Sequence, residues 1–385
     1  MQGAGAVESL DGAHRSAYGV GRDWREAVEA CLAALEPAPP DATLGIVYVT
    51  DHLAAHLSEI VRELGQACGV EQWCGTVSLG IAAPGLEIFD EPAISLLLLS
   101  LPKGSFRLLP SSGDDLALPP ELPPWLEAQG GAGGLIHADP RTPDLAEMVA
   151  SLAELYGVEA VGGLSASRAE QAQTAGSTSL GATSVLGLSG ALFAPGIRPL
   201  HGLSQGCSPL GPLRQITAAE GKLIASIDGR PALTVLAEDV GAGLTEDPRY
   251  QLAGVHMALP IPGGSAFDYL VRNILGIDPV GGVIAVGEEV EPGQRLQFVR
   301  RDATAAAGDL DRMLGEVLRQ LEGPPRAAVY ISCVARGPHL FGPGSQELQR
   351  LHAVLGEIPL TGFFAQGEIC NRRLYGYTGV LTLFP

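Results

Sequence analysis

The residues that could do chemistry gather late in the sequence, around Cys333. This cysteine ends a β-branched run at residues 327–333, and Arg336 and Gly337 lie in the glycine- and proline-rich loop that follows. In open α/β sheets, ligands bind in the crevice beyond the strand ends, and a neighbouring guanidinium favours the thiolate form of a cysteine. We therefore expect Cys333 and Arg336 at a ligand-binding crevice, with an inert, buried thiol as the alternative.

A carboxylate that could complete this site is Glu368, which directly follows Gly367 in the phrase GFFAQGEI. Glycine lets the backbone approach a ligand closely. If these side chains face one cavity, Arg336 can hold a carboxylate with its planar guanidinium, and Glu368 can accept hydrogen bonds from an ammonium group. The sequence also allows a structural ion pair between Arg336 and Glu368, or a solvated surface position for Glu368.

Signatures of catalysis are incomplete. The phrase GLSQG would make Ser204 a hydrolase nucleophile, but prolines follow where the required helix would run. His52 and His56 have the four-residue spacing of metal ligands without the glutamate of HExxH, so we expect His56 to be partly buried and structural. Cys333 has no identified base. We expect a protein without catalytic residues, metal or cofactor, and keep a cysteine-dependent enzyme using Cys333 as a third hypothesis.

Composition excludes several classes of protein. Twenty-four basic and 43 acidic residues give a net charge of −19, which leaves few cations for nucleic-acid phosphates. The longest apolar run, residues 94–101, is too short to span a membrane, so we expect no membrane insertion. Neither GxxxxGK[ST] nor GxGxxG occurs, so nucleotide binding has no support. Six cysteines form no CxxC pair, which fits the reducing cytoplasm.

Helical and strand patterns alternate along the chain. Apolar residues recur at three- and four-residue steps, which predicts helices at residues 24–35, 53–64, 145–156 and 310–321. The stretch 102–124 holds six prolines, so we expect an irregular surface excursion there. Asp228-Gly229 predicts a hairpin turn. The alternation predicts an α/β (α+β) fold of two domains, each a mixed sheet flanked by amphipathic helices.

A weak internal repeat of strand, helix, strand and strand also runs through the sequence. Two copies span residues 46–101 and 328–384, and a poorer third copy spans residues 135–193. Duplicated units imply a shared architecture whatever the chemistry. Chance similarity is the alternative, because any α/β chain can be aligned loosely to itself.

Five phrases in the second half occur in the order typical of one known family. They are HGLSQGCSPLGPLRQITAAEGKLIASIDGRPAL (201–233), VRNILGID (271–278), VYISCVARG (329–337), GFFAQGEI (362–369) and YGYTGVLTLF (375–384). On these phrases the sequence resembles the FIST family, the F-box and intracellular signal transduction proteins, over about residues 20–385. The resemblance implies an N-terminal FIST domain at 20–215 and a C-terminal FIST domain at 216–385, divided at the glycine and proline cluster before residue 215.

The resemblance further implies a sensory module that binds a small polar ligand, with amino acids as the suggested class, and passes its state to a downstream signalling protein. The positions that match the family's C-terminal motifs are then expected to contact the ligand: Cys333, Arg336, Gly337, Phe363, Gly367, Glu368, Thr378, Arg272 and Asn273. A protein-interaction scaffold or adaptor is the alternative function.

Overall fold

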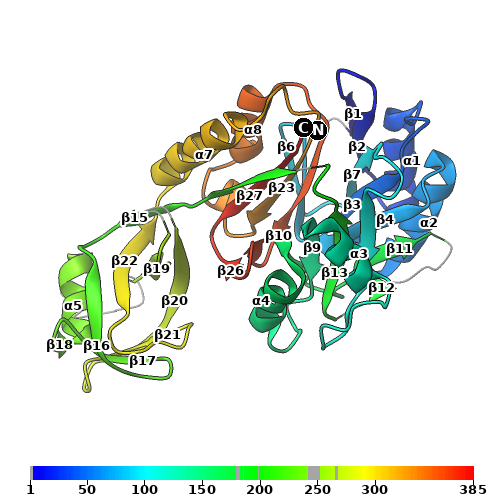
Figure 1. The fold of residues 1–385 in the computed structure, drawn as a ribbon. Helices are drawn as coiled ribbons and strands as arrows, with labels where there is room; N and C mark the ends of the chain where they lie inside the picture. The colour runs from blue at the N-terminus through cyan, green and yellow to red at the C-terminus, as the bar shows by residue number, and fades with distance from the viewer. Residues whose placement is uncertain (1–2, 179–182, 185, 198, 242–251, 265–267) are drawn as a thin grey trace. The chain divides into compact units, whose positions relative to one another are not determined.

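A computed structural model describes residues 3–178, 183–184, 186–197, 199–241, 252–264 and 268–385. Its sheets combine parallel and antiparallel strands with flanking helices, which confirms the predicted mixed α/β class (Figure 1). The chain divides into two compact units. Unit 1 comprises Met1–Ser204 and Leu310–Pro385, and unit 2 comprises Gln205–Asp309. The two units are therefore not consecutive halves of the chain, and the division at 215/216 stays a prediction for the family domains.

Three stretches of unit 1 share one topology, which we call repeats I, II and III. Each has a first strand, a helix, a second strand, a helix, a third strand, a pair of short strands and a last strand. Repeat I comprises β2 (His14–Val20), α1 (Trp24–Leu35), β3 (Leu44–Thr50), α2 (Leu57–Cys68), β4 (Gln72–Ser78), β5 (Gly80–Ala83), β6 (Leu86–Phe89) and β7 (Ala93–Leu99). Repeat II comprises β8 (Phe106–Leu109), α3 (Leu122–Gln129), β9 (Ala132–Ala138), α4 (Leu145–Tyr156), β10 (Val158–Leu164), β11 (Gln173–Ser177), β12 (Thr183–Ser184) and β13 (Leu188–Phe193).

Repeat III has the same order, but unit 2 follows its first strand and includes the first seven residues of its first helix, 303–309. It comprises β14 (Leu200–Ser204), α7 (Ala303–Leu318), β23 (Ala327–Cys333), α8 (Gln346–Leu355), β24 (Leu360–Ala365), β25 (Glu368–Cys370), β26 (Arg373–Tyr375) and β27 (Gly379–Phe384). Strand β1 (Ala4–Glu8) pairs with β2, and the short 3-10 helices η1 (Asp51–His56) and η2 (Gly337–His339) follow β3 and β23.

The short strand pairs are exchanged between the repeats. In each repeat the second strand lies between the antiparallel last strand and the parallel third strand, giving β7-β3-β4, β13-β9-β10 and β27-β23-β24. The β5–β6 pair then joins β24 of repeat III, β11–β12 joins β4 of repeat I, and β25–β26 joins β10 of repeat II. Each sheet is thus completed by strands from another repeat, and the three exchanges form a closed cycle.

Local sequence explains where the helices begin and end. The predicted helices at 24–35 and 145–156 are α1 and α4. Asp23 caps α1 by accepting hydrogen bonds from two of its first backbone N–H groups, and Gly157 ends α4 in the left-handed conformation. The stretch predicted as a helix from residue 53 begins instead as η1, and α7 lies several residues earlier than predicted. Within the described ranges, no helix is long and apolar enough to cross a membrane.

One glycine recurs at the middle of the third strand of every repeat: Gly75, Gly162 and Gly362. A Cβ at these positions would lie 1.8, 1.7 and 1.8 Å from backbone carbonyl oxygens of the neighbouring parallel strand, those of Val47, Ile136 and Tyr330. No side chain can be accommodated so close to a backbone atom, so each strand requires glycine there. The equivalent position in three sheets supports the shared topology independently of the strand order.

The core of unit 1 includes a cluster of rings from all three repeats. Tyr48 of β3 places its hydroxyl 3.1 Å from Nε2 of His137 in β9. The ring of Phe363 in β24 lies 4.7 Å from that of Tyr48, centroid to centroid. All three residues are fully buried. Burial lowers the pKa of His137 to about 3, so its imidazole is neutral in the core.

Unit 2 is an antiparallel sheet that closes on itself. Strand β22 pairs with β16 on one side and with β19 on the other, which completes the ring β16-β17-β21-β20-β19-β22. Its elements are β15 (Cys207–Pro209), β16 (Arg214–Glu220), β17 (Leu223–Ile227), β18 (Arg230–Pro231), α5 (Ala232–Val240), β19 (Val255–Pro260), β20 (Tyr269–Asp278), β21 (Val283–Val286) and β22 (Arg295–Arg301). Asp228 and Gly229 both have positive φ between β17 and β18, which confirms the predicted turn.

The prediction that residues 102–124 form an irregular surface excursion is wrong in part. Strand β8 lies within it, and α3 begins at its end. Both elements tolerate the prolines because none lies inside β8 and those of α3 lie in its first turn, where a missing N–H costs no helical hydrogen bond. In the third predicted copy, residues 179–182 and 185 lie outside the described residues.

Replacing Gly75 by alanine should destabilise the protein strongly, because the new methyl group would collide with the Val47 carbonyl. We expect a loss of about 2–4 kcal/mol in the free energy of unfolding, measured by urea denaturation. Gly176→Ala is the matched control in the same sheet, since its Cβ would meet open space, and should change stability by less than about 1 kcal/mol. Equal effects of the two variants would contradict the close approach of the strands.

Candidate functional site

Seven of the nine predicted ligand-contacting residues lie in repeat III. Cys333 ends β23, Arg336 and Gly337 lie at the start of η2, Phe363 is in β24, and Gly367, Glu368 and Thr378 surround β25 and β26. The other two, Arg272 and Asn273, lie in β20 of unit 2. Within unit 1 the structure brings Cys333, Glu368 and Thr378 together, and it holds Arg336 and Gly337 around a different carboxylate.

Arg336 is the largest charged side chain buried in unit 1, with an exposed fraction of 0%. Its Nε donates to Oε1 of Glu347 at 2.8 Å, and its Nη2 lies 3.3 Å from Oγ of Ser204. The guanidinium carbon also lies 5.2 Å from the ring centroid of Phe341. Burial alone would lower the pKa of Arg336, but the charge of Glu347 raises it, so the side chain stays a cation. The ion pair of Arg336 is therefore with Glu347 and not with Glu368.

Glu347 accepts hydrogen bonds from two segments of repeat III, β23 and the start of η2. Its carboxylate accepts hydrogen bonds from the hydroxyl of Tyr330 at 2.7 Å, from that of Ser332 at 3.0 Å and from the backbone N–H of Gly337 at 2.9 Å. An ionised carboxylate only accepts, so this set of donors matches its capacity. Together with Arg336, it makes a closed polar centre at the carboxyl end of β23.

Glu368 forms a second buried carboxyl group, close to Cys333. Its Oε2 accepts from the backbone N–H of Thr378 at 3.1 Å and from the Thr378 hydroxyl at 2.7 Å. The thiol of Cys333 faces the carboxyl, but no hydrogen bond of good geometry reaches Oε1 among the described residues. The exposed fraction of Glu368 is 0%, so the alternative of a solvated surface position for this residue is wrong. Burial raises the pKa of Glu368 to about 8, which keeps it protonated at neutral pH.

Cys333 is a buried thiol rather than a thiolate. Its exposed fraction is 4%, and burial followed by the nearby Glu368 raises its pKa. Arg336 opposes this shift only weakly, because its charge is directed to Glu347. The expectation that the guanidinium activates this cysteine is therefore wrong for the structure as it stands.

The remaining predicted residues are also engaged within the protein. Phe363 belongs to the ring cluster of the core. At Gly337, where φ is +49°, a Cβ would lie 2.8 Å from the Phe364 ring. In unit 2, Arg272 pairs with Glu288, and the Asn273 carboxamide oxygen lies 3.1 Å from Nδ1 of His256.

Two motifs considered for catalysis have structural positions. Ser204 is buried at the end of β14, and a strand rather than a helix follows it, so the geometry of a nucleophile elbow is absent at this described segment. His56 is exposed and stacks on Trp24 with ring centroids 5.6 Å apart. The expectation of a partly buried His56 is wrong because η1 turns this residue out of the apolar stripe.

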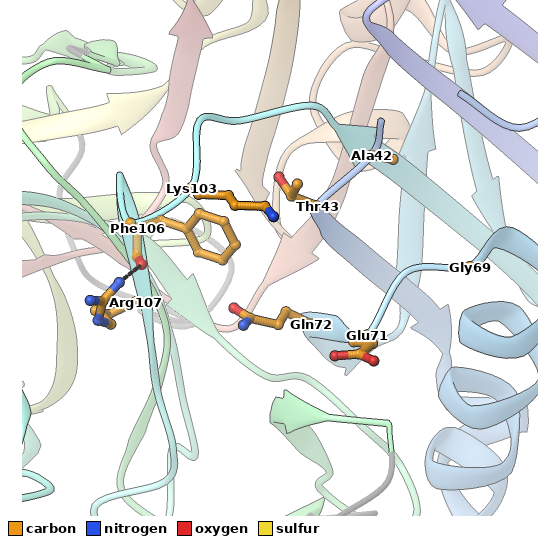
Figure 2. A pocket seen from close by; sticks show the side chains of 9 residues that line it. Ala42, Thr43, Gly69, Glu71, Gln72, Lys103, Phe106 and Arg107 are labelled. Carbon is orange, nitrogen blue, oxygen red and sulfur yellow. Dashed lines mark hydrogen bonds between the residues drawn. The ribbon is translucent and has the colours of Figure 1, made fainter. Parts of the chain in front are cut away.

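An open cavity of about 310 Å³ lies elsewhere in unit 1 (Figure 2). The ring of Phe106 and the carboxamide of Gln72 point into it, the ammonium group of Lys103 lies near Thr43, and the carboxylate of Glu71 lies at the opposite margin. Among the described residues, neither Lys103 nor Glu71 has a side-chain hydrogen bond or ion pair. The full lining is Ala42, Thr43, Gly69, Glu71, Gln72, Lys103, Gly104, Phe106 and Arg107.

Arg107 lies at the margin of this cavity and is held by its own surroundings. Its Nη1 donates to the carbonyl oxygen of Phe106 at 2.8 Å, as Figure 2 shows, and its guanidinium carbon lies 5.4 Å from the ring centroid of Trp125. The hydroxyl of Thr43 is likewise engaged with the backbone of Leu101. Lys103 and Glu71 are therefore the charged groups of the cavity that are available to a ligand.

The cavity lies where repeat I meets repeat II. Thr43 and Gln72 stand at the starts of β3 and β4, Lys103 lies in the turn before β8, and Phe106 begins β8. A second cavity, of about 20 Å³, occupies the equivalent place between repeats II and III, with Glu159 of β10 and His201 of β14 in its wall. That volume holds about one water molecule.

Direct contacts join repeats III and I. The backbone N–H of Leu360, at the start of β24, donates to Oγ of Ser16 in β2 at 3.1 Å, and Arg326 pairs with Asp11 in the turn before β2. The cavity between repeats I and II, in contrast to that between repeats II and III, has the volume and charges suited to a small ligand.

Sequence reasoning missed Glu347, Lys103 and Glu71. Glu347 lies in an ordinary amphipathic helix pattern, and Lys103 lies in a stretch expected to be irregular. No motif marks either of them. Packing within repeat III brings Glu347 to its partners, and the junction between repeats I and II brings Lys103 and Glu71 to the cavity.

Comparison with known proteins finds one family over most of the chain. The FIST N domain model matches residues 43–230, and the FIST C domain model matches residues 232–371. An uncharacterised protein of Mycobacterium tuberculosis H37Rv is 37% identical over 203 residues, which are 49% of this chain and 52% of that protein. An uncharacterised protein of Mycobacterium bovis is 36% identical over 49% of this chain and 51% of its own length. The matches thus span about half the length of these relatives. A solved structure of PurLQS from Thermotoga maritima covers 100% of this chain and 74% of its own with 10% identity and a TM-score of 0.20, too low to carry an argument.

Removing the buried cation should cost far more stability than removing an exposed one. Arg336→Met leaves the Glu347 carboxylate buried without its ion-pair partner, and we expect a loss of about 3–5 kcal/mol in urea unfolding. Arg350→Met is the matched control, because Arg350 makes a bidentate pair with Asp311 at the surface, and it should cost about 0–1 kcal/mol. Losses of similar size in the two variants would contradict a structural role for the buried pair.

The buried Glu368 should make stability fall as pH rises. Its folded-state pKa of about 8 exceeds the ordinary value of 4.5, so its contribution is present in full below about pH 4.5 and is lost as pH rises through about 8. Glu368→Gln, which keeps an oxygen to accept from Thr378, should flatten this dependence by about 1 kcal/mol per pH unit between pH 5 and 8. Parallel pH profiles of wild type and variant in urea unfolding would show that Glu368 is ionised in the fold.

Proposed function

Because the chain belongs to the FIST family, we propose that it is a non-catalytic sensory protein that binds a small polar ligand, with amino acids as the first class to test. FIST domains are associated with sensory roles in signal transduction. The observation that carries the ligand site is the 310 Å³ cavity between repeats I and II, with Lys103 and Glu71 at its opposite sides.

The side chains of the cavity suit a ligand that carries one negative and one positive charge. A ligand carboxylate can pair with the ammonium group of Lys103, and a ligand ammonium group can pair with Glu71. Gln72 can donate and accept between them, and the ring of Phe106 offers an apolar wall. Because its wall comes from two repeats, a bound ligand would connect them.

The family motifs predict several residues in contact with the ligand, and this proposal gives three of them a structural role. Cys333, Arg336 and Glu368 are buried and face protein groups, which supports a role in holding repeat III in shape. Direct contact of these residues, or of Arg272 and Asn273, with a ligand stays a prediction that the experiment below also tests.

The raised pKa and burial of Cys333 support the non-catalytic assignment, because a nucleophilic cysteine needs the thiolate and an open approach. A downstream signalling protein, a cytoplasmic location and an origin of the three repeats by duplication are further parts of the proposal. All six cysteines are free thiols, which supports a reducing compartment.

A thermal-shift screen across amino acids and related metabolites tests the proposal. A ligand at 100 times its dissociation constant should stabilise the wild type by about 2.7 kcal/mol. Lys103→Met and Glu71→Gln should each weaken binding about tenfold or more, since each removes one charged partner. Lys222→Met and Glu220→Gln are matched controls, because both residues are exposed near one turn of unit 2, and they should keep the full shift.

The other outcomes of this screen are also informative. A shift that survives Lys103→Met but disappears in Glu368→Gln would move the site to the buried carboxyl near Cys333. The absence of a shift with every compound would contradict small-ligand binding and favour the scaffold alternative.

A further inference from the structure

Glu87 joins two repeats through the start of a helix. It lies in β6, the outer strand of the exchanged β5–β6 pair that repeat I contributes to the sheet of repeat III. Its Oε1 accepts hydrogen bonds from the backbone N–H groups of Glu347 at 3.1 Å and Leu348 at 3.2 Å. These are the second and third residues of α8, whose N–H groups have no partner within the helix.

The contact is reciprocal. The backbone N–H of Glu87 donates at 2.9 Å to Oγ of Ser345, which immediately precedes α8. Ser345 itself makes no side-chain cap to its own helix. A residue 260 positions earlier in the chain therefore does what an N-cap side chain usually does.

The second oxygen of Glu87 has no such partner. Oε2 is buried, has no hydrogen-bond partner among the described residues, and lies 3.2 Å from where a Cβ at Gly337 would be. Gly337 in turn donates its N–H to Glu347. The free oxygen of Glu87 thus lies beside the closed polar centre.

The charges around Glu87 oppose its ionisation. Glu347 on α8 is the nearest carboxylate, and its charge is already paired with the buried Arg336. Two further titratable groups lie on the neighbouring elements: Tyr330 of β23 donates to Glu347, and His352 of α8 lies beside the Gly85 turn of the β5–β6 pair. Burial and the charge of Glu347 raise the pKa of Glu87 to about 7, although the two helix N–H groups lower it.

We propose that Glu87 is a proton-dependent latch, which in its neutral form fastens the β5–β6 pair of repeat I to the start of α8 in repeat III. Loss of the proton places a second, uncompensated negative charge beside Glu347 and weakens the contact. The junction that closes the cycle of repeats is then tighter at mildly acidic pH than above neutrality. This inference does not rest on ligand binding.

The direction of the effect follows from linkage. In the closed contact the pKa of Glu87 is about 7, and in the opened, solvated state it returns to about 4.5. The closed state therefore binds the proton more tightly between these values, and its advantage is present below about pH 4.5 and lost as pH rises through about 7.

Amide hydrogen exchange of the full chain tests the latch. In the wild type, after correction for intrinsic exchange, the opening constant of the α8 amides should rise by up to about tenfold per pH unit between pH 5 and 7, and then level off. Glu87→Gln keeps an oxygen for the helix N–H groups but has no proton to lose, so its α8 amides should show no such rise. The amides of α4 in repeat II serve as the internal reference.

Two further measurements keep the test decisive. Glu29→Gln removes an exposed carboxyl on α1 and should leave the pH dependence of α8 unchanged. In the wild type, the Glu87 side-chain carboxyl carbon should titrate near pH 7 by NMR, a result that does not depend on the variant folding. A Glu87 midpoint near 4.5, or the same α8 profile in Glu87→Gln and wild type, would overturn the proposal.

Discussion

The exchange of short strands is the constraint on which unit 1 depends. Parallel strands such as β3 and β4 need a third neighbour to cover the open edge of β4, and in this protein the neighbour comes from a different repeat each time. Since the three exchanges form a cycle, no repeat can complete its sheet alone. The insertion after β14 does not break the cycle, because β14 still pairs with β27 and β23 still pairs with β24.

The cycle creates three equivalent junctions between repeats, and these junctions differ in their cavities and contacts. The junction between repeats I and II carries an open cavity with unpaired charges, the one between II and III a small cavity, and the one between III and I direct contacts. The fully buried Arg336 and Glu347 lie in repeat III, and Glu87 of repeat I accepts hydrogen bonds at the start of the same helix, α8. This division fits the proposed sensory role, because the open junction can respond to a ligand while direct contacts hold repeats III and I together.

Buried charge explains why the family motifs and the open cavity do not coincide. Arg336 and Gly337 donate to Glu347, and Thr378 donates to Glu368, so removing a partner would leave a polar group buried and unsatisfied. Packing alone therefore restricts which residue types these positions can hold. A ligand site needs the opposite condition, charges that the fold leaves exposed and unpaired, and Lys103 and Glu71 meet it.

Local physics in the sequence determined the mixed α/β class, helices α1 and α4 to the residue, and the turn at Asp228-Gly229, because each depends on periodicity, caps or backbone freedom within a few residues. The sequence pattern also indicated three similar stretches, and the recurring glycines of the third strands explain why. Only the tertiary structure decided the exchange of strands, the partner of Arg336 and the ionisation of Glu87 and Glu368. Some of the groups involved lie far apart in the chain, as Glu87 and Glu347 do at a separation of 260 residues. Burial, which no local pattern encodes, sets the cost of each charge.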